Sequence, residues 1–361
     1  MKILIDINHP AHVHYFKNLI KIMEEQGHTF VIINRDSKII NELLDCFQIK
    51  HKIRNKRPTK TNLVSTIFYL IGIILYCIKE SIKEKPNIYL GFGSSPCAIT
   101  AYIFKKPSIL IDDTEHNKIN HLLYKPFCSV VLTPFYFKKK LGNNQLYFQA
   151  YVEQLYLHSR YYTPNTDILK KIGLDNTPYA LVRYISYDAH HDSEIKPLKE
   201  EVKKQLVVEL SKKMRVLVSS ESDIIDKFYK PYQVCFSPEK MHDVMAHASF
   251  FLTEGATMAS EACILGVPYL YINPLQNLGN ILEQVKMYPS IACQSSDSEK
   301  ISALIQEKIT QKITPEFKEK IKHTIEKTTI NPTDFFVWFV ENYPKSARIM
   351  KENSDFQYTF K

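Results

Sequence analysis

One segment combines small residues with carboxylates in a pattern suited to binding a diphosphate. It contains Glu254, Gly255, Ala256 and Thr257 at the start of an expected helix. Small side chains in the first turn would let a phosphate reach the free N–H groups and the positive end of the helix dipole. Glu261 follows further along this helix, where a carboxylate could accept hydrogen bonds from ribose hydroxyls. The alternative is a glutamate on a solvated helix face.

Groups that could move protons follow two other expected strands. His12 comes soon after the first strand, and an imidazole there could act as a general base near neutral pH. Asp113 and Glu115 follow a strand at 108–111, and carboxylates there could orient or deprotonate a sugar hydroxyl. The alternatives are a capping or core histidine at position 12 and a solvated, helix-capping turn at 112–116.

Further polar residues could complete a binding site for a phosphorylated ligand. A guanidinium matches the geometry of a diphosphate, which makes Arg183 a candidate, with an interdomain salt bridge as the alternative. The other supporting candidates are Ser219, Glu221, Gln276 and Asn280. His190, His191 and Asp192 could form a cluster, but the surrounding polar loop favours a solvated turn. No HExxH, GxGxxG or GK[ST] motif is present, so we expect no metal, no NAD and no P-loop chemistry.

Alternating strand and helix patterns must position these residues. Short apolar runs at 2–7, 30–33, 87–90, 108–111, 129–132 and 146–148 predict strands. Apolar residues at helical spacing follow at 12–25 and 96–104. This order predicts a doubly wound parallel sheet, whose ligands bind beyond the carboxyl ends of the strands.

The second half of the chain repeats this architecture. Strands are expected at 179–184, 215–219, 250–252 and 269–272, with a helix at 256–265. We therefore predict one domain at 1–158, a second at 159–330, and a helical tail at 331–361 that could pack back across the junction. A length of 361 residues suits two such domains.

Composition places the chain among ordinary globular proteins. It has 45% hydrophobic and 24% charged residues, which excludes disordered and fibrous classes. A net charge of +9 favours anionic partners, but no basic stripe with interleaved aromatics indicates nucleic acid. Seven scattered cysteines without a CxxC pair are expected to be reduced and buried. With no signal peptide pattern at the N-terminus, we expect a cytoplasmic protein.

A long apolar run lies at 63–78. Its sixteen residues are fewer than the roughly 20 that a spanning helix needs. Basic residues surround it at Arg54, Lys56, Arg57 and Lys60, and again at Lys79, Lys83 and Lys85. Residues 54–85 could thus form a peripheral contact with an anionic membrane, the alternative being a core helix with solvated ends.

Several segments together resemble a known prokaryotic family. HPAHVHYFK, DDTEH, TPFYF, VRYISYDAHHD and EGATMASEACILGVP look like the family called domain of unknown function 354, found among polysaccharide-synthesis proteins. The last segment is also similar to the nucleotide-sugar signature of GT-B glycosyltransferases and non-hydrolysing UDP-GlcNAc 2-epimerases. The resemblance implies a GT-B-like fold, with two Rossmann-type domains facing a central cleft. The acceptor would bind the first domain and the nucleotide-sugar the second.

The resemblance also implies roles for single residues. In the GT-B transferase that adds GlcNAc to a lipid-linked muramyl-peptide, a histidine opens the first helix, as His12 does here, and a glutamine and an asparagine contact the donor sugar, as Gln276 and Asn280 would. We expect a metal-independent transferase that needs no cofactor and moves a sugar from a nucleotide-sugar to a glycan or lipid-linked acceptor. A nucleotide-sugar epimerase and a non-catalytic glycan-binding or sugar-nucleotide-binding protein are the alternatives.

Overall fold

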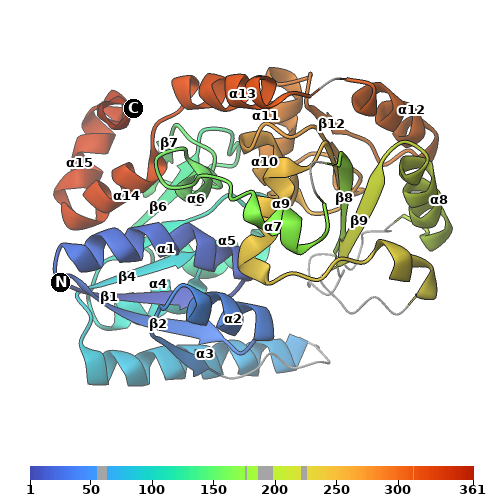
Figure 1. The fold of residues 1–361 in the computed structure, drawn as a ribbon. Coiled ribbons are helices and arrows are strands. Elements are labelled where there is room, and N and C mark those ends of the chain that lie inside the picture. Colours follow the sequence, from blue (N-terminus) through green and yellow to red (C-terminus); the bar gives the residue numbers. More distant parts are fainter. Residues whose placement is uncertain (55–62, 175–176, 186–197, 221–225, 312) are drawn as a thin grey trace. The chain divides into compact units, whose positions relative to one another are not determined.

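The chain folds into two compact units, shown in Figure 1. The structure, a computed structural model, describes residues 1–54, 63–174, 177–185, 198–220, 226–311 and 313–361. Unit 1 comprises Met1–Tyr156 and Thr329–Lys361, and unit 2 comprises Leu157–Thr328. The segment expected to form a helical tail therefore belongs to unit 1.

Unit 1 is built on a seven-stranded parallel sheet. Its strands are β1 (Lys2–Ile7), β2 (Thr29–Arg35), β3 (His51–Arg54), β4 (Ile88–Phe92), β5 (Ser108–Ile111), β6 (Val130–Pro134) and β7 (Gln145–Phe148). Their order in the sheet is β3-β2-β1-β4-β5-β6-β7, and every neighbouring pair is parallel. This confirms the predicted doubly wound sheet, although the sequence analysis misses β3.

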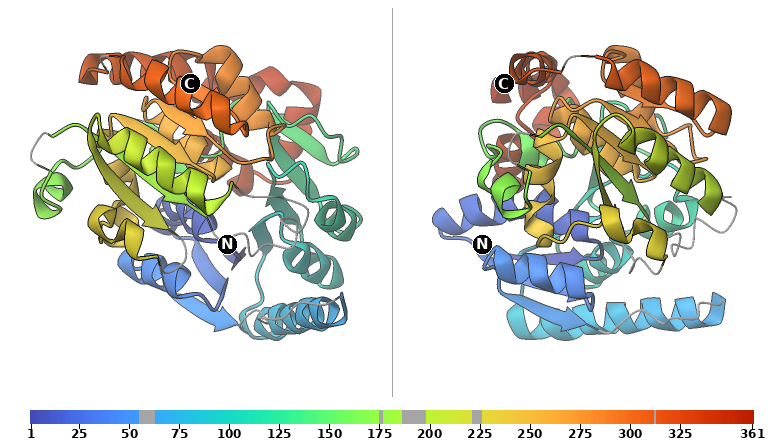
Figure 2. Two further views of the ribbon diagram at one scale, coloured as in Figure 1. Left: turned by 90° about the vertical axis from the view of Figure 1, so that its right-hand side faces the viewer. Right: turned by 45° about the vertical axis from the view of Figure 1, so that its right-hand side comes forward.

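Helices cover both faces of this sheet (Figures 1 and 2). They are α1 (Pro10–Glu25), α2 (Lys38–Cys46), α3 (Leu63–Glu84), α4 (Ser95–Ile103), α5 (Lys118–Tyr124), α6 (Gln154–Leu157, at the unit boundary), α14 (Pro332–Glu341), α15 (Lys345–Glu352) and the 3-10 helix η3 (Ser354–Phe360). Buried residues of α3, α4 and α5 form one core cluster with the sheet. In unit 1, α1 packs against α14, so a helix from each end of the chain lies side by side with the other.

Unit 2 has a five-stranded parallel sheet. Its strands are β8 (Tyr179–Tyr184), β9 (Arg215–Ser220), β10 (Phe250–Thr253), β11 (Tyr269–Tyr271) and β12 (Ala292–Gln294), in the order β12-β11-β10-β8-β9. Its helices are α7 (Asp167–Lys171), α8 (Glu200–Ser211), α9 (Met241–His247), α10 (Ala256–Ile264), α11 (Gly279–Met287), α12 (Ser298–Ile309) and α13 (Pro315–Thr328), with the 3-10 helices η1 (Lys227–Tyr232) and η2 (Pro238–Lys240). Strand β12, at the edge of this sheet, is not among the strands predicted from the sequence.

Helix α3 is longer than its apolar run indicates. It continues through a charged turn to Glu84, and residues Val64–Glu84 are long and apolar enough to cross a membrane by length and composition. Only 22% of its most apolar window is buried. The expectation that this segment is too short to span is therefore wrong on length.

The cysteines differ from expectation at two positions. All seven are free, and five are buried, but Cys46 and Cys235 are exposed. Cys46 is the last residue of α2, and Cys235 lies in an irregular segment after η1. The expectation that all seven cysteines are buried is therefore wrong at Cys46 and Cys235.

Candidate functional site

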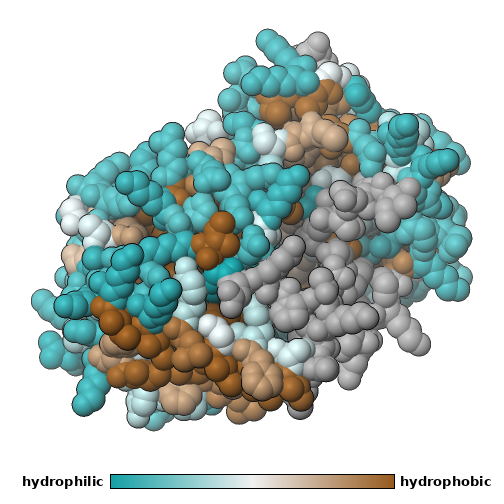
Figure 3. Space-filling model, turned by 90° about the horizontal axis from the view of Figure 1, so that it is seen from below, coloured by the Kyte–Doolittle hydropathy of each residue, from teal (hydrophilic) through white to brown (hydrophobic). Residues whose placement is uncertain are grey.

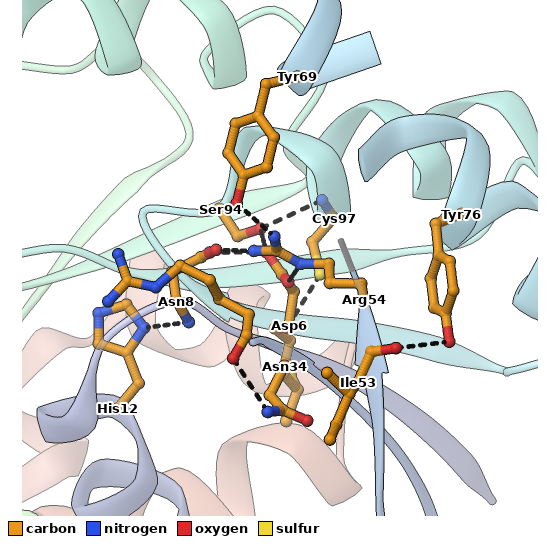
Figure 4. A network of polar contacts seen from close by, with 12 residues as sticks. Asp6, Asn8, His12, Asn34, Ile53, Arg54, Tyr69, Tyr76, Ser94 and Cys97 are labelled. Carbon is orange, nitrogen blue, oxygen red and sulfur yellow. Dashed lines mark hydrogen bonds and ion pairs between the residues drawn. The ribbon is translucent and has the colours of Figure 1, made fainter. Parts of the chain in front are cut away.

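Asp6, near the end of β1, is the centre of a buried polar network in unit 1 (Figure 4). Its Oδ1 accepts a hydrogen bond from Nε of Arg54 at 3.1 Å. Its Oδ2 accepts hydrogen bonds from Asn8 Nδ2 and from Ser94 Oγ, each at 2.7 Å. A buried carboxylate is tolerated only when it is paired and hydrogen-bonded, and Asp6 meets both conditions.

Arg54 connects this network to α3 and to the loop after β1. It is 2% exposed, its Nη1 donates to the hydroxyl of Tyr69 on α3 at 3.0 Å, and its Nη2 donates to Oδ1 of Asn8. From the sequence, Arg54 is expected to be one of the basic residues beside the apolar run at 63–78 that could contact a membrane. That is wrong, because its charge is used inside unit 1 to fix the Asn8 side chain.

His12 lies in the first turn of α1 and is almost fully buried. The N-cap residue of the helix is His9, whose Nδ1 accepts from the backbone N–H of Ala11 at 3.2 Å. The His12 ring packs against Phe92 and Tyr15, with centroids 5.0 and 6.0 Å away. Its position at the carboxyl edge of the sheet agrees with a site residue.

The loop after β1 also sets the protonation state of His12. The backbone N–H of Asn8 donates to Nδ1 of His12 over 3.4 Å, so the neutral ring carries its proton on Nε2. Burial lowers the pKa of His12 well below its ordinary value, and the nearby charges of His9 and Arg35 lower it further. At neutral pH, Nε2 is therefore a hydrogen-bond donor. This state favours stabilising charge on a ligand oxygen over accepting a proton.

Asp113, directly after β5, is the stronger candidate for a general base. Its side chain is half-buried, and the hydroxyl of Thr114 donates to its Oδ1 at 3.1 Å. Burial raises the pKa of Asp113 to about 7, and the neighbouring carboxylate of Asp112 adds to the increase. A carboxyl group that titrates near pH 7 has the proton affinity that general base catalysis requires.

The other carboxylates of this loop hold the loop in place. Asp112 is 2% exposed; its Oδ2 accepts from the hydroxyl of Tyr124 at 2.7 Å and lies 3.2 Å from Nε2 of His121. Glu115 accepts a hydrogen bond from the backbone N–H of Lys138. These contacts fix the segment after β5 on two sides.

A buried tyrosine lies near Asp113. Tyr136 is 5% exposed, and its hydroxyl has no hydrogen-bond partner among the described residues. Burial raises the pKa of Tyr136 well above its ordinary value, and the carboxylates of Glu153 and Asp113 raise it further. Tyr136 therefore stays protonated at neutral pH and could donate a hydrogen bond to a ligand hydroxyl.

In unit 2, the N-terminus of α10 has the geometry of an anion site. Gly255 is the N-cap residue, and among the described residues no side-chain hydrogen bond caps the helix there. Ala256 and Thr257, in the first turn, are half-buried. A Cβ at Gly255 would approach Ile185 Cγ2 to 3.3 Å, so a small residue suits this position. Helix N–H groups left without a cap are available to a phosphate.

The side chain of Glu254, the residue directly before Gly255, lies inside unit 2. Its side chain is fully buried, its Oε1 lies 2.7 Å from Nζ of Lys203 on α8, and its Oε2 accepts from the backbone N–H of Ile185 at 3.3 Å. Its carbonyl oxygen accepts from Asn273 Nδ2 at 3.0 Å. Glu254 thus connects three segments around the start of α10, which makes it a positioning residue for that helix.

Glu261, in the second turn of α10, is paired with a histidine. Its Oε1 lies 3.0 Å from Nε2 of His242 on α9, and both side chains are at most 6% exposed. The edge of the His242 ring meets Tyr162, whose hydroxyl donates to Asp243 at 2.9 Å. The carboxylate of Glu261 therefore has a fixed orientation, as a group that binds a diol needs.

Two of the supporting candidates lie side by side on neighbouring strands. Arg183 on β8 pairs in register with Ser219 on β9, and its Nη1 donates to Ser219 Oγ at 2.6 Å. Arg183 also pairs in register with Thr253 on β10, one residue before Glu254. Arg183 thus lies at the same carboxyl edge as the start of α10. Glu221 lies outside the described residues.

Gln276 and Asn280 follow β11. Gln276 is half-buried and donates to the carbonyl of Asn273, while Asn280 is 8% exposed at the start of α11. Asn273 joins both loops, because it also holds the carbonyl of Glu254. The structure therefore connects this segment with the loop before α10.

Several of these partners carry no signal in the sequence. Lys203 lies in a charged helical segment, and His242 in a segment that the sequence analysis does not single out. Asp6 is different, because an acidic residue inside the apolar strand KILIDI is a sequence signal for a buried polar site. A charge in a buried strand predicts a partner, here Arg54.

Metal ligands do not gather in the part of the chain that the structure describes. Within it, no group of three or more His, Cys, Asp or Glu side chains is placed to hold an ion. The Asp112 and His121 pair has Tyr124 and Lys139 Nζ as its other neighbours, the latter 2.7 Å from Nδ1 of His121. The segment with His190, His191 and Asp192 lies outside the described residues.

Solved structures of two enzyme types share this fold. A UDP-GlcNAc 2-epimerase from Neisseria meningitidis, bound to UDP-GlcNAc, has a TM-score of 0.66 at 15% identity and covers 98% of this chain and 99% of its own. MurG of Acinetobacter baumannii has a TM-score of 0.58 at 12% identity, covering 94% of this chain and 99% of its own. Such identities establish the fold alone: two α/β domains with parallel sheets, like GT-B epimerases and glycosyltransferases.

Sequence relatives extend over most of the chain. An uncharacterized protein of Methanocaldococcus jannaschii is 25% identical over 294 residues, which are 77% of this chain and 84% of the relative. The family described as "Protein of unknown function (DUF354)" matches residues 1–328. The two parallel-sheet units and this match over nearly the whole sequence make the protein a member of the DUF354 family.

Proposed function

We propose that this protein is a metal-independent glycosyltransferase. It moves a sugar from a nucleoside diphosphate donor to a hydroxyl of a glycan or lipid-linked acceptor, as a step in surface polysaccharide or glycoconjugate synthesis. The observation that carries the proposal is the N-terminus of α10 at Gly255, which no described side chain caps, with the fixed carboxylate of Glu261 in the next turn. Fold relatives that bind UDP and UDP-GlcNAc support a nucleotide-sugar as the ligand.

The donor would bind to unit 2. The diphosphate accepts hydrogen bonds from the N–H groups of Ala256 and Thr257, and the helix dipole stabilises the charge that develops as the sugar leaves. Glu261 accepts hydrogen bonds from the ribose hydroxyls. Arg183 adds a cation at the same edge of the sheet, and Gln276 with Asn280 contacts the donor sugar.

The acceptor would bind to unit 1. Asp113 takes the proton of the acceptor hydroxyl while the acceptor oxygen attacks the anomeric carbon, and the bond from that carbon to the diphosphate breaks. The proton on Nε2 of His12 and the phenol of Tyr136 donate hydrogen bonds to oxygens of the reacting sugars. In this scheme His12 orients and stabilises, and Asp113 is the base.

The contacts of the carboxylates favour a transferase over an epimerase. An epimerase must eliminate and re-add the diphosphate, for which it needs several acid–base groups around one sugar ring. Of the candidates, Glu254 is fully buried against Lys203, and Glu115 accepts from the backbone of Lys138. Asp113 is half-buried, and burial raises its pKa to about 7, so it is the carboxyl group that we assign as the base.

The first test is nucleotide binding, followed by turnover. Thermal shift and calorimetry against UDP, GDP, CMP, dTDP and their sugar conjugates identify the donor, because a ligand that binds the native state raises the melting temperature. The identified donor is then incubated with and without extracted glycan or lipid-linked acceptors, and free nucleotide and product sugars are measured. Release of nucleotide only with acceptor is expected. Conversion of the donor to its epimer without acceptor would establish the epimerase instead, and binding without any product would leave a binding protein.

A further inference from the structure

Helix α3 exposes a continuous apolar stripe (Figure 3). The exposed residues are Val64, Ile67, Phe68, Ile71, Leu75 and Ile82. Phe68 is 69% exposed and Leu75 is 58% exposed, and steps of three, four and seven residues place the set on one side of the helix. Contiguous apolar surface of this kind marks a binding surface in a folded protein.

Two neighbouring helices add to this surface. Their exposed apolar residues are Tyr102 and Ile103 of α4 and Ile119, Leu122 and Leu123 of α5. Helix α4 packs against both α3 and α5, and buried residues of all three belong to one core cluster on the same face of the sheet. Three neighbouring helices of unit 1 therefore expose apolar side chains, and the sequence indicates only the first of them.

The charges exposed on α3, α4 and α5, and in the turns directly after them, are all basic. Exposed lysines are Lys79, Lys83, Lys85, Lys105, Lys106, Lys118 and Lys125. Within residues 64–85, 95–106 and 117–126, all of which the structure describes, no acidic side chain is exposed. Glu80 is buried and Glu84 is half-buried, and both pair with Lys52. The face thus combines apolar residues with positive charge that its own carboxylates do not neutralise.

The opposite side of α3 is fixed in unit 1. Ile73 and Cys77 are buried in the core, Ser81 accepts from the hydroxyl of Tyr89 at 2.8 Å, and Tyr69 binds Arg54. A helix held along its length by a sheet cannot be surrounded by lipid on all sides. Only its outer side can meet a bilayer, with the helix lying in the plane of the interface.

We propose that the outer face of α3, α4 and α5 docks unit 1 on the surface of an anionic lipid bilayer. Apolar side chains enter the headgroup region while the lysines contact anionic headgroups. A second copy of the chain fits less well, because a two-fold contact would bring this lysine-rich face against itself. The inference goes beyond the proposed function, since it holds for a transferase or an epimerase alike.

Flotation with vesicles tests the wild-type protein directly. Vesicles of phosphatidylglycerol mixed with phosphatidylcholine should carry the full chain upward at low salt, and binding should weaken as salt is raised because the lysine contribution is screened. Vesicles of phosphatidylcholine alone should bind much less. Absence of the protein from the phosphatidylglycerol vesicles at low salt would overturn the proposal.

Variants separate the contribution of the apolar side chains to vesicle binding from the contribution of the lysines. Phe68→Ser with Leu75→Ser should reduce partitioning by at least about tenfold, because both apolar side chains leave the interface. Lys79→Gln with Lys83→Gln should reduce it about fivefold for each lysine and flatten the salt dependence. Val208→Ser, on the exposed side of α8 in unit 2, is the matched control and should bind like the wild type.

Size-exclusion chromatography of the same proteins tests whether the face binds a second copy of the chain instead of a bilayer. The Phe68→Ser, Leu75→Ser protein should keep the wild-type elution volume and melting temperature, since both residues are exposed. If these changes dissociate an oligomer and leave vesicle binding intact, the face belongs to a second copy of the chain and the proposal fails. Nucleotide binding, measured in solution without vesicles, should be unchanged and reports independently on the proposed function.

Discussion

Nε2 of His242 lies 3.0 Å from Oε1 of Glu261, and both side chains are almost completely buried in unit 2. The two residues are 19 positions apart, on α9 and α10. Because a buried carboxylate with a fixed partner keeps one orientation, the pair can hold a diol more tightly than a mobile glutamate could. His242 is thus a positioning residue for Glu261.

Replacing Glu261 should weaken nucleotide binding in proportion to the bonds it accepts. Glu261→Gln is expected to reduce affinity about 10-fold to 100-fold, since a hydrogen bond to a charged group contributes roughly 1.5–3 kcal/mol. Calorimetric titration with the nucleotide found by thermal shift measures the change. An unchanged Kd would refute the ribose role of Glu261.

His242 should act through Glu261 and not by itself. His242→Ala is expected to lower nucleotide affinity about tenfold, while His242→Gln, which can still donate a hydrogen bond, recovers part of the loss. In the Glu261→Gln background, His242→Ala should have a smaller effect, because interacting residues are not additive. Full additivity in this double-mutant cycle would contradict the positioning role.

Turnover should follow the ionisation of Asp113. The carboxylate form is the base, and its pKa is raised to about 7, so the rate should rise as pH increases through about 7 and level off above it. Asp113→Asn should reduce kcat about 100-fold to 10,000-fold with little change in nucleotide affinity. His12→Gln, which keeps an N–H donor, should lose less activity than His12→Ala. Equal activity of Asp113→Asn and wild type would exclude Asp113 as the base.

The ionisation of Asp113 should also make the stability of the protein depend on pH. The folded-state pKa of Asp113 is above its unfolded value, so its contribution to stability is present below the unfolded pKa and is lost as pH rises through about 7. The melting temperature of Asp113→Asn minus that of the wild type should therefore be more positive at pH 8 to 9 than at pH 4. A difference independent of pH would indicate an ordinary carboxyl pKa.

The buried pair of Asp6 and Arg54 should be costly to break. Asp6→Asn leaves the guanidinium without its charge partner, and breaking a buried ion pair costs about 3–5 kcal/mol. Urea unfolding followed by fluorescence of Trp338, the single tryptophan, reports on unit 1, where that residue lies in α14. Lys38→Gln, which breaks an exposed pair with Glu42, is the control and should change stability by less than about 0.5 kcal/mol.

Gly266 should tolerate no side chain. It has φ +70° at the end of α10, and a Cβ would lie 2.6 Å from the carbonyl oxygen of Lys318 on α13. Gly173 has the same φ, but a Cβ there would meet nothing within 4 Å. Gly173→Ala should therefore cost about 1 kcal/mol from backbone strain alone, and Gly266→Ala clearly more. Thermal unfolding by circular dichroism compares them, and equal losses would disprove the steric contribution.

Much of the fold can be predicted from local patterns. The strands at 108–111 and 179–184 have the predicted bounds, and the helix predicted at 256–265 ends one residue earlier. These elements are apolar runs bounded by turn residues, so neighbouring residues carry the information. Strands β3 and β12 are not predicted from the sequence, and it is their pairing with β2 and β11 that defines them as strands.

By itself, the sequence determined the alternation of strands and helices, the small residues at the start of α10, and the acidic loop after β5. Those features depend on residue types that are close along the chain. Only the tertiary structure decided which charges meet: Arg54 turns inward to Asp6 over a separation of 48 residues, and His242 meets Glu261 across two helices. It also decided that Asp113 titrates near neutrality and which side of α3 faces outward. Burial and charge pairing depend on packing between distant segments, which the local sequence does not encode.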